Sequence, residues 1–372
     1  MTKSDDLLPE GLADRLPHSA NRITRAMRAC LDALESHGYD RVRPPLLEFE
    51  HSLASRMKGI KTRNAFRFVD PDSLRTLALR SDITPQIGRI AATSMADAPR
   101  PLRLAYCGDT ALIRASQLDP ARERLQLGAE LIGADTAQAA GEIVAVAVEA
   151  LVAAGLTGIS VDFTLPDLVD TLAEKAMPLD AEQIDAVRRE LDTKDAGGLK
   201  QAGGVAYLPL LYATGPFAEA LEKLRAIDAG GALASRIAGL EAVAARVDKK
   251  ARITLDPSER HGFEYQTWFG FTIYADGVRG AAGRGGTYRI GGSDEAATGF
   301  TLYVDALAEA APEADTADTL YLPLGHDEEA AARLRAIGWR TVAQLGPEGE
   351  GGEDAKALGC THRLDGKDTT AL

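Results

Sequence analysis

The sequence has few of the residues that mark a metal centre, a disulfide framework or a membrane span. Its three cysteines, Cys30, Cys107 and Cys360, lie far apart, with no CxxC pair and no histidine spaced to complete a zinc site. We therefore expect free thiols in a reducing, cytoplasmic setting and no bound metal. No run approaches the roughly 18 apolar residues of a membrane helix, and no apolar signal segment follows Met1, so we expect no membrane contact.

Positive charge is also scarce. The chain has 42 Lys and Arg against 55 Asp and Glu, a formal net charge of −13. Because binding along a nucleic acid depends on clustered Lys and Arg, we expect no nucleic-acid partner. The sequence has no GxSxG, HExxH or Walker motif. The glycine-rich residues 277–292 lead into extended chain rather than a helix, so we interpret them as turns and expect no cofactor.

What is present is the pattern of an α+β protein. Apolar residues recur at helical spacing in two long stretches, and a third helix is predicted from a capping residue followed by proline. The predicted helices are residues 17–37, 84–95 and 137–154, and the predicted strands lie in 65–70, 74–80, 102–107, 125–132 and 263–305. Because the strands come in turn-linked pairs, we predict a mainly antiparallel sheet flanked by helices.

Composition divides the chain into parts. Residues from about 166 to 250 are rich in Ala, Leu, Glu and Lys at helical spacing, which predicts a helical insertion in a domain of residues 1–307. The acidic, alanine-rich residues 308–318 are typical of a linker. Residues 319–372 predict a small strand-helix-strand unit whose last four residues, from Thr369, are frayed.

Several segments stand in an informative order. They are Leu7-Leu-Pro-Glu-Gly11, the Pro-Pro segment 42–48, Leu79-Arg-Ser-Asp-Ile-Thr-Pro85, residues 102–133, residues 260–274 and Gly299-Phe-Thr-Leu-Tyr-Val-Asp305. In this order they resemble the catalytic domain of histidyl-tRNA synthetases, a class II synthetase family, and of its paralogue, the ATP phosphoribosyltransferase regulatory subunits. Segment 42–48 corresponds to motif 1, residues 102–133 to motif 2 and residues 299–305 to motif 3. The resemblance implies a class II synthetase-like fold over most of residues 7–307.

The resemblance also implies a histidine site. In that family a carboxylate on the amine loop, with a Gln and a Glu on the motif 2 strand, surrounds the α-amino group, and the matching residues are Asp82, Gln126 and Glu130. An ammonium group needs such acceptors, and two residues four apart on a strand share a face. The full set expected to bind histidine as an effector is Asp82, Thr84, Arg114, Gln126, Glu130, Arg260, His261, Tyr265 and Tyr274. Arg114 does not align cleanly with the motif 2 arginine, so a solvated loop position stays open for it.

The sequence departs from the synthetases at positions that serve ATP. Where they carry an activating arginine, this chain has His261, and Arg260 sits one residue earlier, on the opposite face of an extended strand. Gln266 replaces a tyrosine, and Ala306 stands where motif 3 has an arginine that contacts ATP. Losing one such cation typically costs several kcal/mol of transition-state stabilisation. We therefore expect no catalytic residues and no activation of histidine.

The resulting hypothesis is a non-catalytic regulatory subunit of ATP phosphoribosyltransferase, needed by the short catalytic subunit in the first step of histidine biosynthesis. The resemblance implies a hetero-octamer with that subunit, a homodimer core through the motif 1 region, and histidine feedback. Two alternatives stay open: a divergent histidyl-tRNA synthetase, and a free-standing amino-acid-binding protein. Whether the altered pocket still holds histidine also stays open.

Overall fold

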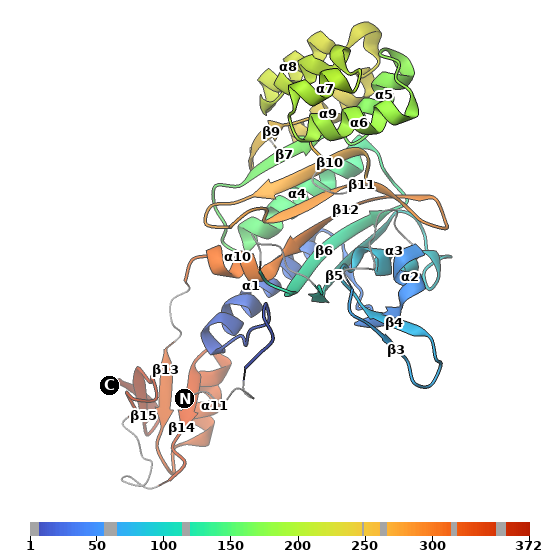
Figure 1. The fold of residues 1–372 in the computed structure, drawn as a ribbon. Coiled ribbons are helices and arrows are strands. Elements are labelled where there is room, and N and C mark those ends of the chain that lie inside the picture. Colours follow the sequence, from blue (N-terminus) through green and yellow to red (C-terminus); the bar gives the residue numbers. More distant parts are fainter. Residues whose placement is uncertain are drawn as a thin grey trace. The chain divides into compact units, whose positions relative to one another are not determined.

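The structure is a computed structural model that describes residues 7–55, 65–113, 120–247, 249–260, 266–313, 318–346 and 355–372. The chain forms two compact units, Met1–Pro312 and Glu313–Leu372 (Figure 1). Each is described by itself below.

One large sheet forms the centre of the first unit. Among the described residues it has nine strands, in the order β1-β5-β6-β12-β11-β10-β7-β9-β8. Their bounds are β1 Asp40–Arg41, β5 Leu102–Ala111, β6 Glu123–Ile132, β7 Ser160–Thr164, β8 Gly215–Pro216, β9 Arg252–Leu255, β10 Gln266–Tyr274, β11 Gly283–Ile290 and β12 Glu295–Tyr303. Only the β1–β5 and β7–β9 pairs are parallel among these described pairs. The predicted mainly antiparallel sheet is confirmed.

Helices cover one face of this sheet. They are α1 Pro17–Ser36, α4 Ala137–Ala153 and α9 Ala234–Val247, with the short α10 Val304–Ala310 following β12. The Thr136 side chain caps α4 by accepting a hydrogen bond from the backbone N–H of Ala139. The many small residues of α4, such as Ala140 and Gly141, are buried and let the helix approach its neighbours closely.

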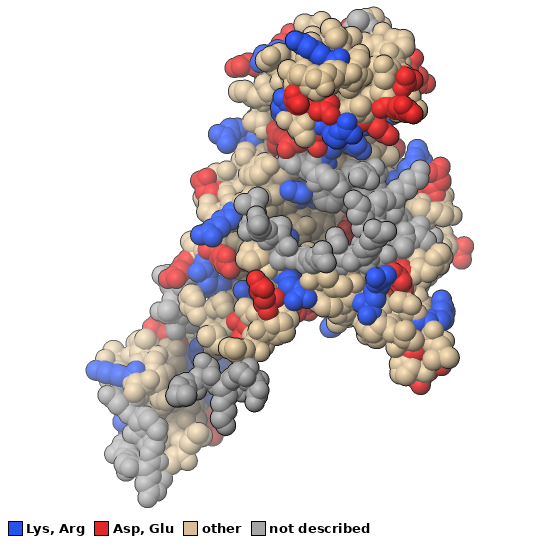
Figure 2. All heavy atoms as spheres, viewed as in Figure 1, with Lys and Arg blue, Asp and Glu red and all other residues tan. Residues whose placement is uncertain are grey.

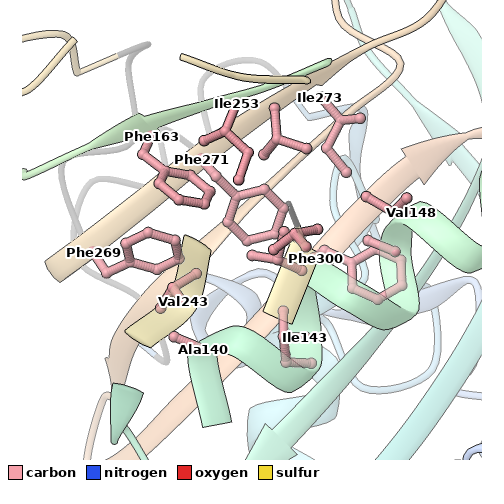
Figure 3. Packing of buried hydrophobic residues seen from close by; sticks show 14 of the residues in the cluster. Ala140, Ile143, Val148, Phe163, Val243, Ile253, Phe269, Phe271, Ile273 and Phe300 are labelled. Carbon is pink, nitrogen blue, oxygen red and sulfur yellow. The ribbon is translucent and has the colours of Figure 1, made fainter. Parts of the chain in front are cut away.

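The main core lies between these helices and the sheet. Figure 3 shows the rings of Phe163, Phe269, Phe271 and Phe300 on the helix-facing side of the strands, with Ile143 on α4 among them. The ring centroids of Phe163 and Phe269 are 5.2 Å apart in an edge-on arrangement, a favourable geometry for aromatic pairs. Because side chains alternate along a strand, the neighbouring residues point to the other face, where the candidate site lies.

A helical segment is inserted between β7 and β9. It contains α5 Leu168–Lys175, α6 Ala181–Asp192, α7 Ala196–Gln201, the 3-10 helices Val205–Tyr212 and Ala229–Gly231, α8 Phe217–Ile227 and α9. A capping box between Asp180 and Gln183 starts α6, and the Asp195 side chain accepts the first amide hydrogens of α7. Buried leucines of these helices, including Leu191 and Leu224, belong to the same core as the sheet.

A three-stranded sheet adjoins the end of β5, where the backbone N–H of Ala111 donates to the carbonyl of Arg80, the residue after β4. It consists of β2 Leu47–Phe49, β3 Arg67–Val69 and β4 Thr76–Leu79 in the antiparallel order β2-β4-β3. The predicted turn-linked pair of strands in residues 65–70 and 74–80 is confirmed by the pairing of β3 with β4. Two helices, α2 Glu50–Ser55 and α3 Thr84–Ala92, belong to the same region. The turn into α3 carries Asp82 and Thr84 toward the pocket face of the large sheet.

The second unit has a small sheet of its own. Its described strands are β13 Thr319–Leu322, β14 Arg340–Ala343, β15 His362–Asp365 and β16 Asp368–Ala371, ordered β14-β13-β15-β16, and α11 Glu328–Ala336 joins β13 to β14. The expectation of a frayed tail was wrong. Thr369 pairs with Leu364 and Thr370 with Arg363 in a hairpin, because Gly366 adopts the left-handed conformation that this turn requires.

The lengths of the helices and the distribution of surface charge both bear on function. None of the helices among the described residues is both long and apolar enough to cross a membrane. Acidic and basic side chains are interspersed over the face of the molecule that Figure 2 shows. Since the chain has a net charge of −13, its basic groups are balanced by a larger number of acidic ones.

Candidate functional site

A row of three glycines shapes the candidate site. In the register of the sheet, Glu130 pairs with Gly299, Gly299 with Gly286, and Gly286 with Gly270. Paired residues share a face, so three neighbouring strands contribute no side chain to this row, and Gly299 and Gly286 line the space next to Glu130. The result is a recess of about 40 Å³ in the sheet, enough for a few water-sized groups.

The recess is lined mostly by polar residues. They are Asp82, Thr84, Gln126, Glu130, Gln266, Arg284, Gly285, Gly286, Tyr288, Gly299, Phe300, Thr301 and Tyr303. They come from the start of α3 and from strands β6, β10, β11 and β12. Three regions of the sequence, residues 82–84, 126–130 and 266–303, therefore meet on one face of the sheet.

Glu130 is the most buried ionisable group of the site. Its side chain is only 1% exposed and accepts a hydrogen bond of 2.8 Å from the hydroxyl of Tyr288, and one of 3.4 Å from that of Tyr106. Burial, with a smaller contribution from the nearby Asp82, raises the pKa of Glu130 to about 8, and the hydrogen bond from Tyr288 opposes part of this shift. At neutral pH the free protein therefore holds Glu130 mainly in its protonated form.

Gln126 positions the amine loop. Its Oε1 accepts the backbone N–H of Ile83 at 3.0 Å, and its Nε2 donates to Asp82 Oδ1 at 2.8 Å. Nε2 also donates to Thr301 Oγ1 at 3.0 Å. Because both ends of the amide are engaged, its first role in this structure is to hold Asp82 rather than to face a ligand. Asp82 Oδ1 in addition accepts the backbone N–H of Thr84 at 3.0 Å.

A buried arginine, Arg80, holds the loop that carries Asp82 in place. Arg80 is 6% exposed; its Nε donates to the Asp109 carbonyl at 2.7 Å and one Nη donates to the Pro44 carbonyl at 3.0 Å. A second nitrogen lies only 2.1 Å from where a Cβ on Gly108 would be, so only glycine fits there. Arg80 thus ties the Pro-Pro segment and the end of β5 to the loop that carries Asp82.

The structure brings together four of the nine residues expected at the site. Asp82, Thr84, Gln126 and Glu130 all line the recess. Arg114, His261 and Tyr265 lie outside the described residues.

Two of the nine stand elsewhere. Tyr274 pairs with Ser160 at the far end of β10 from Gln266, and the backbone N–H of Arg260 donates a hydrogen bond of 3.0 Å to Asp192 Oδ1 at the end of α6. Neither is part of the lining.

Sequence reasoning missed some of the lining. The sequence indicates Gln266 only as the replacement of a tyrosine, and Arg284 and Tyr288 only as part of the glycine-rich residues 277–292 that were expected to form turns, yet all three line the recess. The alternation of Gly283-Arg284-Gly285-Gly286-Thr287-Tyr288 was the available signal, since it places Arg284, Gly286 and Tyr288 on one face.

The arrangement favours a ligand with a positive charge. Carboxylates at Asp82 and Glu130, with the hydroxyl groups of Thr84 and Thr301 nearby, form a set of acceptors sized for an ammonium group. No group of three or more His, Cys, Asp or Glu side chains among the described residues is placed to hold a metal ion.

Adding one methyl group should close the recess. A Cβ at Gly299 would lie 1.6 Å from Glu130 Oε2 and 2.8 Å from the carbonyl oxygen of Ala129, which cannot move away. We expect Gly299→Ala to lower the free energy of unfolding by about 2 kcal/mol, measured by urea denaturation. As a control, Gly197→Ala on the exposed surface of α7 should be neutral or slightly stabilising. Equal effects at both positions would contradict the close packing described here.

Comparison with known proteins gives a consistent result. The family model described as histidyl-tRNA synthetase matches residues 11–307. The chain is 40% identical to an ATP phosphoribosyltransferase regulatory subunit of Rhodospirillum centenum, over 96% of this chain and 94% of the relative. It is 41% identical to a protein of the same name from Paramagnetospirillum magneticum, over 98% of each.

Solved structures agree on the fold. A Bacillus halodurans protein described as ATP phosphoribosyltransferase regulatory subunit/histidyl-tRNA synthetase superposes with a TM-score of 0.80 at 25% identity, covering 96% of this chain and 97% of that one. A histidyl-tRNA synthetase from Nostoc superposes with a TM-score of 0.76 at 15% identity, covering 96% and 90%. The predicted class II synthetase-like α+β fold is confirmed.

Proposed function

The chain belongs to the family of ATP phosphoribosyltransferase regulatory subunits, which share the histidyl-tRNA synthetase fold, and from this premise we propose how it acts. It is a non-catalytic subunit that supports a separate catalytic subunit in the first step of histidine biosynthesis. Its synthetase-type recess serves as the effector site for histidine, whose binding lowers the activity of the complex.

The observation that supports this proposal is that the chain keeps one part of the synthetase site, the acceptors for an amino group, and lacks another, the arginines that contact ATP. The acceptors for an amino group are assembled around Glu130, whereas the position of the motif 3 arginine is Ala306, on α10. Arg260, the displaced cation of the histidine-recognition segment, is not among the lining residues, and its backbone N–H donates to Asp192 at the end of α6. A pocket that can hold an ammonium group but lacks these cations near ATP fits recognition without activation.

Histidine binding supplies the regulation. Its ammonium group occupies the space beside Asp82 and Glu130, with Gln126 fixing the position of Asp82. For feedback, histidine must bind one state of the complex more tightly than another, because a ligand with equal affinity for both shifts nothing.

The assembly that we propose is a hetero-octamer built on a homodimer of this chain. The motif 1 region supplies the homodimer contact, and its exposed apolar side chains support this: Leu46, Leu47, Phe68 and Val69 are 46%, 38%, 43% and 61% exposed in or beside the β2-β4-β3 sheet. We place the complex in the cytoplasm. The three cysteines are free and buried, which suits a reducing compartment.

Two activity measurements test the function. The purified chain, mixed with a short-form catalytic subunit, should raise phosphoribosyl transfer from phosphoribosyl pyrophosphate to ATP at least tenfold, and histidine should reverse the increase. The chain alone should show no histidine-dependent exchange between ATP and pyrophosphate. Robust exchange would identify an active synthetase instead, and a lack of both stimulation and co-elution would indicate a free-standing binding protein.

A further inference from the structure

The recess has a second pole, opposite in charge to the first. Arg284 on β11 is the only cationic side chain among the described residues that line it. The acceptor pole consists of Asp82 and Glu130, which approach from α3 and β6. One cavity therefore presents carboxylates at one end and a guanidinium at the other.

The register fixes how the two poles are related. Arg284 pairs with Thr301, and Thr301 with Gly128, in the same-face row next to the row of Glu130, Gly299 and Gly286. Arg284 therefore lies on the second strand from that of Glu130, and it is displaced along that strand by two residues from Gly286, the residue in the row of Glu130. With strands about 4.8 Å apart and about 7 Å between same-face residues, their Cα atoms are roughly 12 Å apart.

The floor between the poles is open. Gly299, on the intervening strand β12, and Gly286, on the strand of Arg284, contribute no side chain to the space above them, and Thr301 is the side chain that β12 contributes there. The carboxyl of Glu130 hydrogen-bonds to the hydroxyls of Tyr106 and Tyr288. These two partners of Glu130 are neutral, so its negative form would gain a charged partner from the ammonium group of a ligand.

We infer that Arg284 binds the carboxylate of the ligand whose ammonium group lies beside Asp82 and Glu130. A guanidinium group binds a carboxylate through two parallel hydrogen bonds. A ligand that has an amine or an alcohol in place of the carboxylate cannot accept both bonds. The site then selects free α-amino acids, which carry both charges on neighbouring atoms, over amines or acids that carry one. This inference rests on the proposed effector function of the same recess and adds the residue that sets its specificity.

A panel of two ligands tests the role of Arg284. Calorimetry at pH 7.5 should show that the native chain binds L-histidine at least tenfold more tightly than L-histidinol, which lacks the carboxylate. In Arg284→Gln the affinity for histidine should fall by at least tenfold, to that of histidinol, while histidinol binding stays within about twofold. This loss of discrimination would not follow from a general disturbance of the pocket, which would weaken both ligands.

Controls separate the possible failures. Arg289→Gln alters the same strand on the opposite face and should leave both affinities unchanged. If Arg284→Gln does not fold by circular dichroism, Arg284→Lys keeps the charge and should show an intermediate loss for histidine alone. Equal weakening of both ligands, or no change in either, would overturn the assignment of Arg284. If the native chain binds neither ligand, the proposed effector function itself fails.

Discussion

Replacement of Glu130 by glutamine is expected to make the chain more stable than the native protein at pH 9, by on the order of 3 kcal/mol, and about equally stable at pH 5. The reason is the burial of the native carboxyl, which raises its pKa to about 8 in the folded chain. Glutamine has nearly the same shape and carries no charge at any pH. The measurement is urea unfolding of both proteins at the two pH values.

The direction follows from proton binding. An unfolded chain releases the proton of a glutamate near pH 4.3, whereas the folded chain keeps the proton of Glu130 until about pH 8. The folded state thus binds more protons between these values, so this contribution to stability is complete below about pH 4.3 and is lost as the pH rises through 8. Glu123→Gln, at the exposed start of the same strand, is the matched control and should show no such divergence.

The same titration should appear in histidine binding. An ammonium ligand favours the ionised form of Glu130, so binding releases a proton and the affinity should rise, by at most about tenfold, from pH 7 to pH 8. Calorimetry in two buffers of different ionisation enthalpy measures that proton directly. Glu130→Gln should bind more weakly and release none. Parallel pH profiles in the native and variant chains would exclude Glu130 as the titrating group.

Replacement of Arg80 by methionine is expected to cost about 3 to 4 kcal/mol of stability in the first unit. Methionine fills much of the same volume but donates no hydrogen bond, so the carbonyls of Pro44 and Asp109 would lose their partner inside the protein. Burial already lowers the pKa of Arg80, which shows how far the group has been removed from water. Urea unfolding followed by circular dichroism measures the loss.

An exposed arginine provides the comparison for Arg80. Arg28 is exposed on α1, and Arg28→Met should change the stability by no more than about 0.5 kcal/mol. Because Asp82 follows Arg80 by two residues, Arg80→Met should also weaken histidine binding under conditions where the chain is still folded. A loss of stability no larger than that of Arg28→Met would mean that the carbonyls find other donors.

The acceptor half of the site could be predicted because it depends on local rules. Gln126 and Glu130 share a face through the two-residue period of a strand, and the order of the motifs placed Asp82 beside them. The role of Gln126 was not predictable in the same way. Whether an amide faces a ligand or holds a loop depends on where the backbone N–H of Ile83 lies, which no local pattern specifies.

The other half depends on register, which sequence determines only weakly. The alignment of β10, β11 and β12 brings three residues to the face of the sheet that carries Glu130: Gln266, Arg284 and Tyr288. The register of β10 against β11 also shifts between Gln266 and Gly270. A one-residue slip would send Arg284 to the opposite face. In the second unit, the polar β15-β16 hairpin lacks the apolar alternation that predicts strands, so the tail was misjudged.

The glycine row has a consequence for reading other sequences. A binding site is usually identified from the side chains that contact the ligand. Those side chains can be retained by chance in a related protein that no longer binds the ligand. Here the space itself depends on positions 286 and 299, which line the recess without a side chain. A related chain that keeps the glutamate of Glu130 but has a side chain at position 299 has no room for the ligand, so these two glycines separate sensors from silent relatives better than the carboxylates do.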